Sequence, residues 1–250
     1  MAGPLVAILS GAGISTDSGI PDYRGPNGLW RRDPEAEKLA TYEYYMGDPE
    51  IRRRSWQARR AIWAARPEPN AAHRAVADLE RSGVAVRVIT QNVDGLHQRA
   101  GLPARKVLEL HGSTQSVVCT ACGARSPARD ALARLEAGEP DPPCRDCGGI
   151  LKTATVMFGQ ELDPLVLAQA AAIARACAVM IAVGTSLQVY PAAGLVDIAA
   201  SGGARLVIVN AEPTPYDDLA GEVIREPIGT ALPHLLAGLQ GEFGEGAAGP

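Results

Sequence analysis

The chain has 250 residues, a net charge of −4 and a hydrophobic fraction of 46%. A core of this size forms without disulfides, and the net charge gives no general attraction to nucleic acid or anionic membranes, so neither is expected as a direct partner. The most apolar stretch, residues 165–187, contains Gln169 and Arg175 and divides into a helix and a strand, so no membrane-spanning segment is predicted. The apolar run at residues 5–9 lacks the basic flank of an export signal, which favours the cytoplasm.

Short apolar runs rich in β-branched residues predict strands, and each run ends in a polar or glycine-rich turn. In chain order, the runs are residues 6–9, 86–89, 106–110, 179–183 and 206–209. Helices are predicted between them, beginning at Asn70, at Asp163-Pro164 and at Pro191. This alternation indicates a doubly wound, Rossmann-like parallel sheet of the α/β class. Ligands bind beyond the carboxyl ends of such strands, so the polar turns are expected to meet in one cleft.

Two C-x-x-C pairs, with 21 residues between them, are formed by Cys119, Cys122, Cys144 and Cys147. Such pairs place four thiolates tetrahedrally around one zinc, and the glycines that follow each pair allow tight turns. Four cysteines leave no coordination position for water, so the sequence predicts a structural zinc rather than a catalytic one. A redox dithiol, the alternative, needs only one pair, and metal spacing favours a reducing cytoplasm. Cys177 is predicted to be a small buried hydrophobe.

Two segments break the alternation of strands and helices and are interpreted as inserts. The predicted Rossmann-like domain comprises residues 1–37, 70–118 and 152–239. The inserts are a helical segment at 38–69 and a zinc ribbon at 119–151, and residues 240–250 are a predicted flexible tail rich in Gly, Glu and Ala.

Gly11, Ala12 and Gly13 follow the first predicted strand and resemble a phosphate-binding turn in which backbone N–H groups face an anion. The dinucleotide fingerprint is incomplete because Thr16 occupies the third glycine position, and a plain tight turn is the alternative. A long polar loop follows, where a dehydrogenase would enter a helix. The candidate nucleotide-binding residues of this loop are Ser15, Asp22, Tyr23, Arg24 and Trp30. Arg24 is a candidate for a phosphate contact, with a surface ion pair as the alternative.

Six motifs resemble, in order, the successive signatures of the sirtuin family. They are GAGIST at 11–16, GIPDYRGPNGLW at 19–30, TQNVDGLH at 90–97, LHG at 110–112, GTS at 184–186 and VN at 209–210. The paired C-x-x-C module falls where the family has its zinc ribbon. The resemblance covers nearly the whole chain, from Leu5 to Leu236. It implies an NAD-dependent protein-lysine deacylase that cleaves NAD+ at the nicotinamide–ribose bond and transfers the acyl group to ADP-ribose.

The resemblance also implies three catalytic residues: His111, Asn92 and Asp94. His111 would be the general base on a ribose hydroxyl, which suits a side chain with an ordinary pKa near ~6.5. Asn92 would orient a water or hydroxyl, and Asp94 would accept from the nicotinamide amide, although Asn and Asp also form ordinary turns. The remaining histidines, His73, His97 and His234, are predicted to be structural.

Further contacts are implied for the dinucleotide and for an acyl-lysine protein substrate. Those to NAD are Gln91, Gly184, Thr185 and Ser186, Asn210 and Glu212 near the adenosine ribose, and Ile228 at the adenine edge. Those to an extended substrate peptide are Val156, Phe158 and Gly159 on one side and Leu187 and Val189 on the other, with core packing as the alternative for Val156 and Phe158. The oligomeric state is left open, and a monomer is consistent with the pattern.

Departures from the family pattern bear on the acyl group. Tyr23 stands where many members have Phe, and Gln160 stands where Glu is common. Members that prefer acidic acyl groups carry a Tyr and an Arg three residues apart, and the nearest match in this chain is Trp56 and Arg59, or Ser55 in a shifted register. The missing tyrosine favours acetyl or another neutral acyl group.

Three other functions compete with deacylation. Protein ADP-ribosyl transfer would use the same cleavage of NAD. A non-catalytic NAD- or ADP-ribose-binding module is disfavoured by the intact set of Asn92, Asp94 and His111. A nicotinamide dehydrogenase is disfavoured by the incomplete glycine fingerprint and the long loop that follows it.

Overall fold

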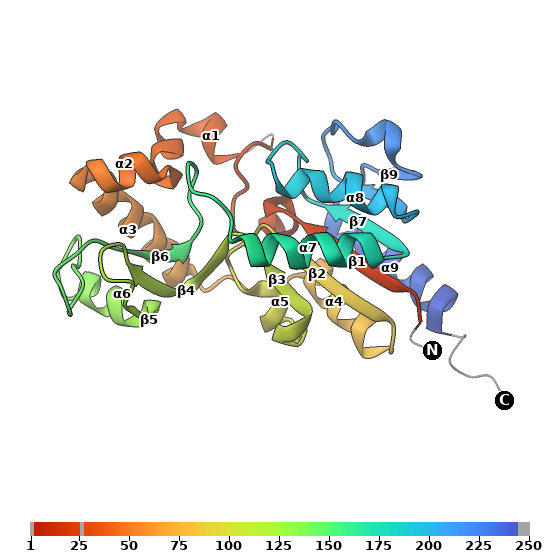
Figure 1. Cartoon of the computed structure of the whole chain (residues 1–250), viewed down its shortest axis with the longest axis horizontal. Coiled ribbons are helices and arrows are strands. Elements are labelled where there is room, and N and C mark those ends of the chain that lie inside the picture. Colours follow the sequence, from red (N-terminus) through yellow and green to blue (C-terminus); the bar gives the residue numbers. More distant parts are fainter. Residues whose placement is uncertain (1–2, 26–27, 245–250) are drawn as a thin grey trace.

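A six-stranded parallel sheet forms the larger part of the molecule (Figure 1). The computed structural model describes residues 3–25 and 28–244. The sheet order is β3-β2-β1-β7-β8-β9, which corresponds to the order 3-2-1-4-5-6 of doubly wound dinucleotide-binding folds and confirms the predicted fold class. The strands are β1 (Leu5–Ser10), β2 (Ala85–Thr90), β3 (Val107–Glu109), β7 (Val179–Val183), β8 (Arg205–Val209) and β9 (Glu222–Ile224). The strand order reverses between β1 and β7, which places the ligand crevice there.

Both faces of this sheet are buried, which explains the continuous apolar runs of its strands. Along β1, Val6 and Ile8 belong to one apolar cluster, whereas Ala7 and Leu9 belong to the cluster on the opposite face. All four side chains are fully buried. Alternate side chains of β1 therefore pack into the two apolar cores on opposite faces of the sheet.

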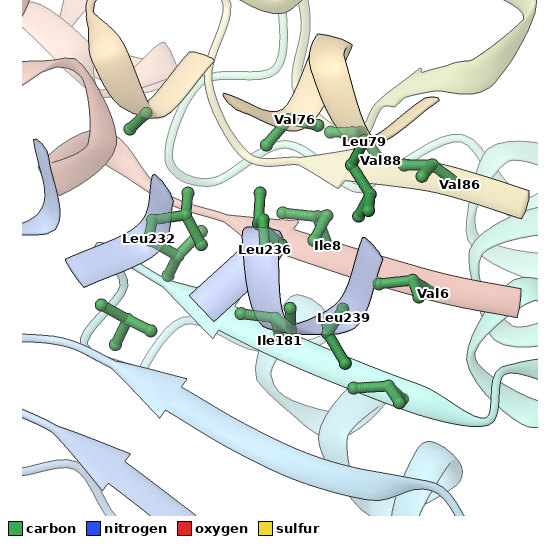
Figure 2. Packing of buried hydrophobic residues seen from close by; sticks show 14 of the residues in the cluster. Val6, Ile8, Val76, Leu79, Val86, Val88, Ile181, Leu232, Leu236 and Leu239 are labelled. Carbon is green, nitrogen blue, oxygen red and sulfur yellow. The ribbon is translucent and has the colours of Figure 1, made fainter. Parts of the chain in front are cut away.

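One face is covered by α4 (Ala71–Arg81) and α9 (Ile228–Gly244). Figure 2 shows their apolar side chains packed against the central strands, and each fully buried Leu or Val contributes about 1.5–3 kcal/mol by leaving water. The labelled contacts are Val76 and Leu79 from α4, Leu232, Leu236 and Leu239 from α9, and Val6, Ile8, Val86, Val88 and Ile181 from the strands. Residues 240–244 continue α9, so the flexible tail predicted from Gln240 is wrong for these five positions, and residues 245–250 lie outside the described part of the chain.

The opposite face is covered by α7 (Pro164–Ala176) and α8 (Leu195–Ser201). The helix starts follow the predicted signals. The Asp163 carboxylate accepts from the Leu165 N–H, with Pro164 at the first helical position, and Asn70 caps α4 by accepting from the N–H groups of Ala72 and His73. The helix predicted from Pro191 begins as the short 3₁₀ helix η4 (Ala192–Gly194) and continues into α8.

A smaller module is built on the antiparallel sheet β5-β4-β6. Its core joins α3 and α6 to that sheet through Trp56, Val117, Leu132 and Leu151. The segments predicted as separate inserts therefore share one core. The sheet spans residues 112–155, so it includes residues 112–118 and 152–155 that the sequence assigned to the larger domain. The module comprises α1 (Leu29–Arg32), η2 (Pro34–Ala40), α2 (Tyr42–Gly47), α3 (Pro49–Ala65), β4 (Gly112–Cys119), β5 (Arg125–Pro127), α6 (Ala128–Glu136) and β6 (Leu151–Thr155).

The remaining elements are short. They are η1 (Ala12–Ser18), α5 (Leu96–Arg99), η3 (Ala104–Lys106) and η5 (Asp217–Leu219). Within residues 3–25 and 28–244, none of the helices combines the length and apolar character needed to cross a membrane.

Candidate active site

A large cleft, with a volume of about 2200 Å³, lies beyond the carboxyl ends of the parallel strands and reaches the smaller module. The position agrees with the expectation that the polar turns meet there. The predicted site residues that line it are Gly11, Ala12, Gly13, Ser15, Asp22, Tyr23, Arg24, Gln91, Asn92, Asp94, His111, Val156, Phe158, Gly159, Gly184, Thr185, Ser186, Val189, Asn210, Glu212 and Ile228.

Two predicted residues do not line this main cleft. The side chain of Leu187 is 1% exposed and packs in the same apolar core as residues of α8, so it does not face the cleft, and a substrate could contact Leu187 only through its backbone. The Leu187 N–H instead donates to Thr185 Oγ1. Trp30 lines a smaller adjoining hollow together with Arg31 and Glu212.

The floor of the cleft is a close contact between two glycine turns. A Cβ on Gly11 would lie 2.6 Å from the Gly184 oxygen, and a Cβ on Gly13 would lie 2.8 Å from the Gly184 Cα. The N–H groups of Gly11 and Gly13 donate to the carbonyls of Val183 and Gly184, so these amides do not face an anion as the sequence suggested. The glycines are required because the backbones of β1 and β7 approach so closely. The cleft above this floor has a volume of about 2200 Å³, more than the roughly 300–1,000 Å³ of an ordinary small-molecule pocket, so it can hold a dinucleotide such as NAD.

Polar side chains converge at the end of β2. Ser15 Oγ donates to Asp94 Oδ2 at 2.8 Å and accepts from Asn92 Nδ2 at 3.2 Å. Asn92 Nδ2 also donates to the Gly11 carbonyl at 3.1 Å. The Asp94 Oδ1 accepts from the Leu96 N–H at 2.9 Å, which fixes the carboxylate at the start of α5. The structure thus brings the predicted pair Asn92 and Asp94 together through Ser15.

His111 follows β3 and begins the connection to the smaller module. Its Nδ1 lies 2.9 Å from the Gln91 carbonyl oxygen, which can only accept, so Nδ1 carries the proton and Nε2 keeps a lone pair. Burial lowers the pKa of His111 below 6.5, although the hydrogen bond to Gln91 opposes this shift. The imidazole is therefore neutral near pH 7, with its basic nitrogen available.

The side chains of the polar loop after η1 pack against one another and against Phe158. The Arg24 guanidinium lies 4.3 Å from the centroid of the Trp30 ring, and the Trp30 and Phe158 rings pack at 5.2 Å. Burial lowers the pKa of Arg24, while Glu37 opposes that shift. Arg24 is stacked on an aromatic ring, and the surface ion pair that was the alternative is not formed with any residue of 3–25 or 28–244. Residues 26 and 27 of the predicted motif lie outside the described residues.

The far end of the cleft lies at the end of β8. Asn210 Nδ2 donates to the Glu212 carbonyl at 2.8 Å, which closes the turn. Arg225 Nη1 donates to the carbonyls of Asn210 and Glu212 at 2.7 and 2.9 Å. Arg31 bonds to the Glu212 carboxylate at 3.2 Å. Sequence reasoning missed Arg225 and Arg31, because neither lies in a motif or has a spacing that marks it.

Part of the backbone of the predicted peptide-binding segment is already hydrogen-bonded within the chain. The Phe158 N–H donates to the Ala40 carbonyl and its carbonyl accepts from the Tyr42 N–H, both at 2.9 Å. Gln160 Oε1 accepts from the Met157 N–H at 3.1 Å, so the amide provides a turn contact that a glutamate oxygen could also provide. Strand pairing through the Phe158 backbone is thus already used within the chain.

The four cysteines of the smaller module gather in one place. Their sulfurs all lie within 4.8 Å of one another, with Cys119–Cys147 at 3.5 Å and Cys122–Cys144 at 3.8 Å. Four thiolates at ~2.3 Å from a tetrahedral zinc would be about 3.8 Å apart, so the cluster fits one structural zinc. A Cβ on Gly149 would lie 3.0 Å from Cys119 Sγ, which explains the glycine after the second pair. Cys177 is buried in the apolar core, as predicted.

A doubly wound sheet with a polar crevice at its strand reversal is a nucleotide-binding α/β protein. Comparison with known proteins narrows this class. The Sir2 family model matches residues 11–191. The chain belongs to the Sir2 family, which confirms the resemblance seen in the motifs.

Relatives of the chain match it over nearly its full length. It is 78% identical to NAD-dependent protein deacetylase 2 of Streptomyces coelicolor, over 94% of this chain and 98% of the relative. It is 44% identical to NAD-dependent protein deacetylase 1 of Pyrobaculum aerophilum, over 93% and 89% of the two chains.

Solved structures of Sir2 proteins resemble the fold of this chain. A Sir2–p53 peptide–NAD+ complex has a TM-score of 0.82 at 35% identity, covering 94% of this chain and 92% of that chain. Sir2Tm bound to a propionylated peptide has a TM-score of 0.82 at 35% identity, with coverage of 94% and 92%.

Proposed function

We propose that this chain removes acetyl or another neutral acyl group from lysine side chains of proteins at the expense of NAD+. The chain is an NAD-dependent protein deacylase, in which the nicotinamide–ribose bond is cleaved and the acyl group passes to ADP-ribose. Support comes from the deacetylase relative at 78% identity and from the solved structures with peptide and NAD+ or with a propionylated peptide.

The observation that carries the proposal is the fixed tautomer of His111 in the cleft. Because Nδ1 donates to the Gln91 carbonyl, Nε2 is left to take a proton. We assign His111 the role of general base toward a ribose hydroxyl. A lowered pKa keeps this base free of its proton at neutral pH.

Asn92 and Asp94 are assigned to the nicotinamide end. Both protons of the Asn92 amide are used by Gly11 and Ser15, so its oxygen is the group that accepts from a water or hydroxyl. Each oxygen of Asp94 accepts one bond within the chain and retains capacity for the N–H groups of an amide. When bound, NAD supplies an electrophilic ribose carbon as its bond to nicotinamide breaks.

The peptide is assigned to the groove between residues 156–159 and Val189. Within the described residues, the Val156 carbonyl and the Gly159 N–H have no backbone partner, whereas both groups of Phe158 are paired. An extended substrate would therefore bond on either side of Phe158. One chain contains the whole cleft, so a monomer suffices. The metal-spaced free cysteines favour a reducing cytoplasm as the location.

The test is incubation of the purified chain with NAD+ and an acetyl-lysine peptide. Deacylation requires nicotinamide, deacetylated peptide and O-acetyl-ADP-ribose in equal amounts, and none of these products without NAD+. If label from the adenine of NAD+ instead accumulates on protein while the peptide stays acetylated, the activity is ADP-ribosyl transfer and the proposal is wrong.

A further inference from the structure

We propose that Arg225 is a positioning residue that holds the far end of the cleft in the shape that binds the adenosine half of NAD+. Arg225 follows β9 and is not one of the residues that line the cleft. The inference rests on the proposed function, because it concerns the co-substrate of that same site.

Two segments border the far end of the cleft, and each follows one of the paired parallel strands β8 and β9. The first is the turn at residues 210–212, and the second is residues 226–228, which lead into α9. The strand β9 has three residues and is the last strand of the sheet. A short edge strand supplies few backbone hydrogen bonds, so a side-chain bond between the two segments has a large share in fixing their spacing. The residues of these segments that line the cleft are Asn210, Ala211, Glu212, Glu226, Pro227 and Ile228.

The Arg225 guanidinium makes such a connection. Its Nη1 donates to the carbonyl oxygens of Asn210 and Glu212 at 2.7 and 2.9 Å, which uses both protons of this nitrogen. The backbone adds one bond, from the Asn210 N–H to the Ile224 carbonyl at 3.1 Å. The turn after β8 is therefore tied to residues 224 and 225 through both the N–H and the carbonyl of Asn210.

These bonds also determine how the Asn210 side chain is presented. Asn210 Nδ2 donates to the Glu212 carbonyl at 2.8 Å, and this oxygen also accepts from Arg225. Among the described residues, the Asn210 amide oxygen has no hydrogen-bond partner, so it is the atom that can accept from a ribose hydroxyl. Arg225 thus fixes the turn on which this acceptor depends.

The charge of Arg225 is already engaged within the chain. Arg225 Nη2 bonds to the Asp217 carboxylate. Asp217 Oδ1 in turn accepts from the N–H and Oγ1 of Thr214 at 3.2 and 2.8 Å. Thr214 therefore orients the carboxylate, and the carboxylate orients the guanidinium. Because its Nη1 and Nη2 groups are used in this way, we assign Arg225 to positioning rather than to a contact with a phosphate of NAD+.

Three substitutions separate positioning from general stability. Arg225→Met keeps the apolar stem and removes every donor. Arg225→Lys keeps a cation, but a compact ammonium cannot reproduce the fork that reaches two carbonyls and Asp217. Arg205→Met is the matched control, because Arg205 begins β8 at its opposite end and pairs there with Glu242. The measurements are Kd for NAD+ and for ADP-ribose by calorimetric titration, kcat and peptide KM at saturating NAD+, and Tm.

We expect Arg225→Met to raise Kd for NAD+ and Kd for ADP-ribose by the same factor, about tenfold for the lost bonds to the turn, because both ligands contain adenosine. Its kcat and peptide KM at saturating NAD+ should match those of the wild type. Arg225→Lys should have intermediate Kd values, and Arg205→Met should have wild-type values. An unchanged Kd in Arg225→Met, an equal rise in Arg205→Met, or a rise for NAD+ without a rise for ADP-ribose would each overturn the inference.

The binding measurement separates this inference from the proposed function. If the wild type binds NAD+ but forms no deacetylated peptide, the function is wrong, and the ratio of Kd values still decides the role of Arg225. If the wild type deacetylates the peptide and Arg225→Met binds NAD+ equally well, only the positioning role is wrong. Tm identifies an Arg225→Met protein that has failed to fold. Arg225→Lys then decides, since a raised Kd supports the role and a wild-type Kd overturns it.

Discussion

The Nδ1 atom of His111 donates to the carbonyl oxygen of Gln91 across 2.9 Å, and this bond determines which ring nitrogen is basic. Gln91 itself is held at the end of β2, where its side-chain amide donates to Thr185 Oγ1 at 3.0 Å and its N–H donates to the Ser10 carbonyl. The tautomer of the proposed base is therefore determined by the backbone of the parallel sheet. A base fixed in this way needs no carboxylate partner.

Replacement of His111 by Ala should strongly reduce turnover and leave NAD+ binding measurable. General acid–base catalysis contributes ~100- to 10,000-fold, so nicotinamide release should fall by about that factor. Calorimetric titration with NAD+ provides the control, because the glycine floor and the end of β8 are unchanged. Undiminished nicotinamide release in this variant would refute the assigned role.

The pH dependence of the wild type should have its acidic limb below pH 6.5. Burial lowers the pKa of His111, so its free base, which is the active form, persists to a lower pH than an exposed histidine would allow. Activity is lost as pH falls through that lowered pKa. The measurement is kcat/KM for NAD+ against pH, and an acidic limb centred above pH 6.5 would contradict the assignment.

Removal of the metal should unfold the smaller module. We expect about one zinc per chain, and Cys144→Ser should lose it because three thiolates no longer close the tetrahedron. Trp56 shares a core with Cys119 and Cys144, so its fluorescence should report the loss. Cys177→Ser is the matched control, because Cys177 lies in the core of the larger sheet and is not part of the cysteine cluster. This variant should retain its zinc. A zinc-free, stable and active Cys144→Ser enzyme would show that the cluster does not hold a structural metal.

The parts of the fold that sequence could predict are those with strong local signals. The buried strands β1, β2, β7 and β8 were predicted because both of their faces are apolar. The strand β9 has only Val223 and Ile224 as apolar residues and lies at the sheet edge, so its pattern is weak. The helix α9 contains Pro233 and several glycines, and its helicity comes from packing on α4 and the sheet.

The same reasoning applies to the site. The candidate residues of the long motifs line the cleft, with the exception of Trp30, because the carboxyl ends of parallel strands must meet. Leu187 follows the GTS motif, but its backbone φ of 53° turns its side chain into the core, which no local pattern reveals. His73 Nε2 lies 3.5 Å from Ser15 Oγ, a contact between residues 58 positions apart. Only the folded chain shows that this histidine faces Ser15.

Adding one methyl group to the cleft floor should lower both the stability of the protein and its affinity for NAD+. In Gly11→Ala, the new Cβ would lie 2.6 Å from the Gly184 oxygen and 2.7 Å from Thr185 Cβ. Overpacking of this kind costs about 1–3 kcal/mol, so Tm should fall and the Kd for NAD+ should rise by about tenfold or more. Gly47→Ala is the control, because a methyl group added there would meet nothing within 4 Å and α2 favours alanine. Equal behaviour of the two variants would contradict the close-contact account.

We expect the acyl preference to depend on positions 56 and 59, which are Trp56 and Arg59 in this chain. Trp56 is 2% exposed in the core of the smaller module, so it offers no hydroxyl to a substrate. Arg59 lines the cleft, and within the described residues it forms no ion pair. Burial lowers the pKa of Arg59, while Tyr23 and Tyr45 oppose the shift. The cleft therefore contains this cation but lacks the tyrosine that accompanies it in members preferring acidic acyl groups.

We expect the wild type to hydrolyse an acetyl peptide faster than a succinyl peptide of the same sequence. Arg59→Met should reduce succinyl turnover by about tenfold, the equivalent of one charged hydrogen bond, and leave acetyl turnover unchanged. Arg53→Met is the control, because Arg53 is exposed and paired with Glu50. The measurement is kcat/KM on both peptides. Faster succinyl hydrolysis by the wild type would refute the neutral-acyl preference, and an unchanged ratio in Arg59→Met would show that this cation does not reach the acyl group.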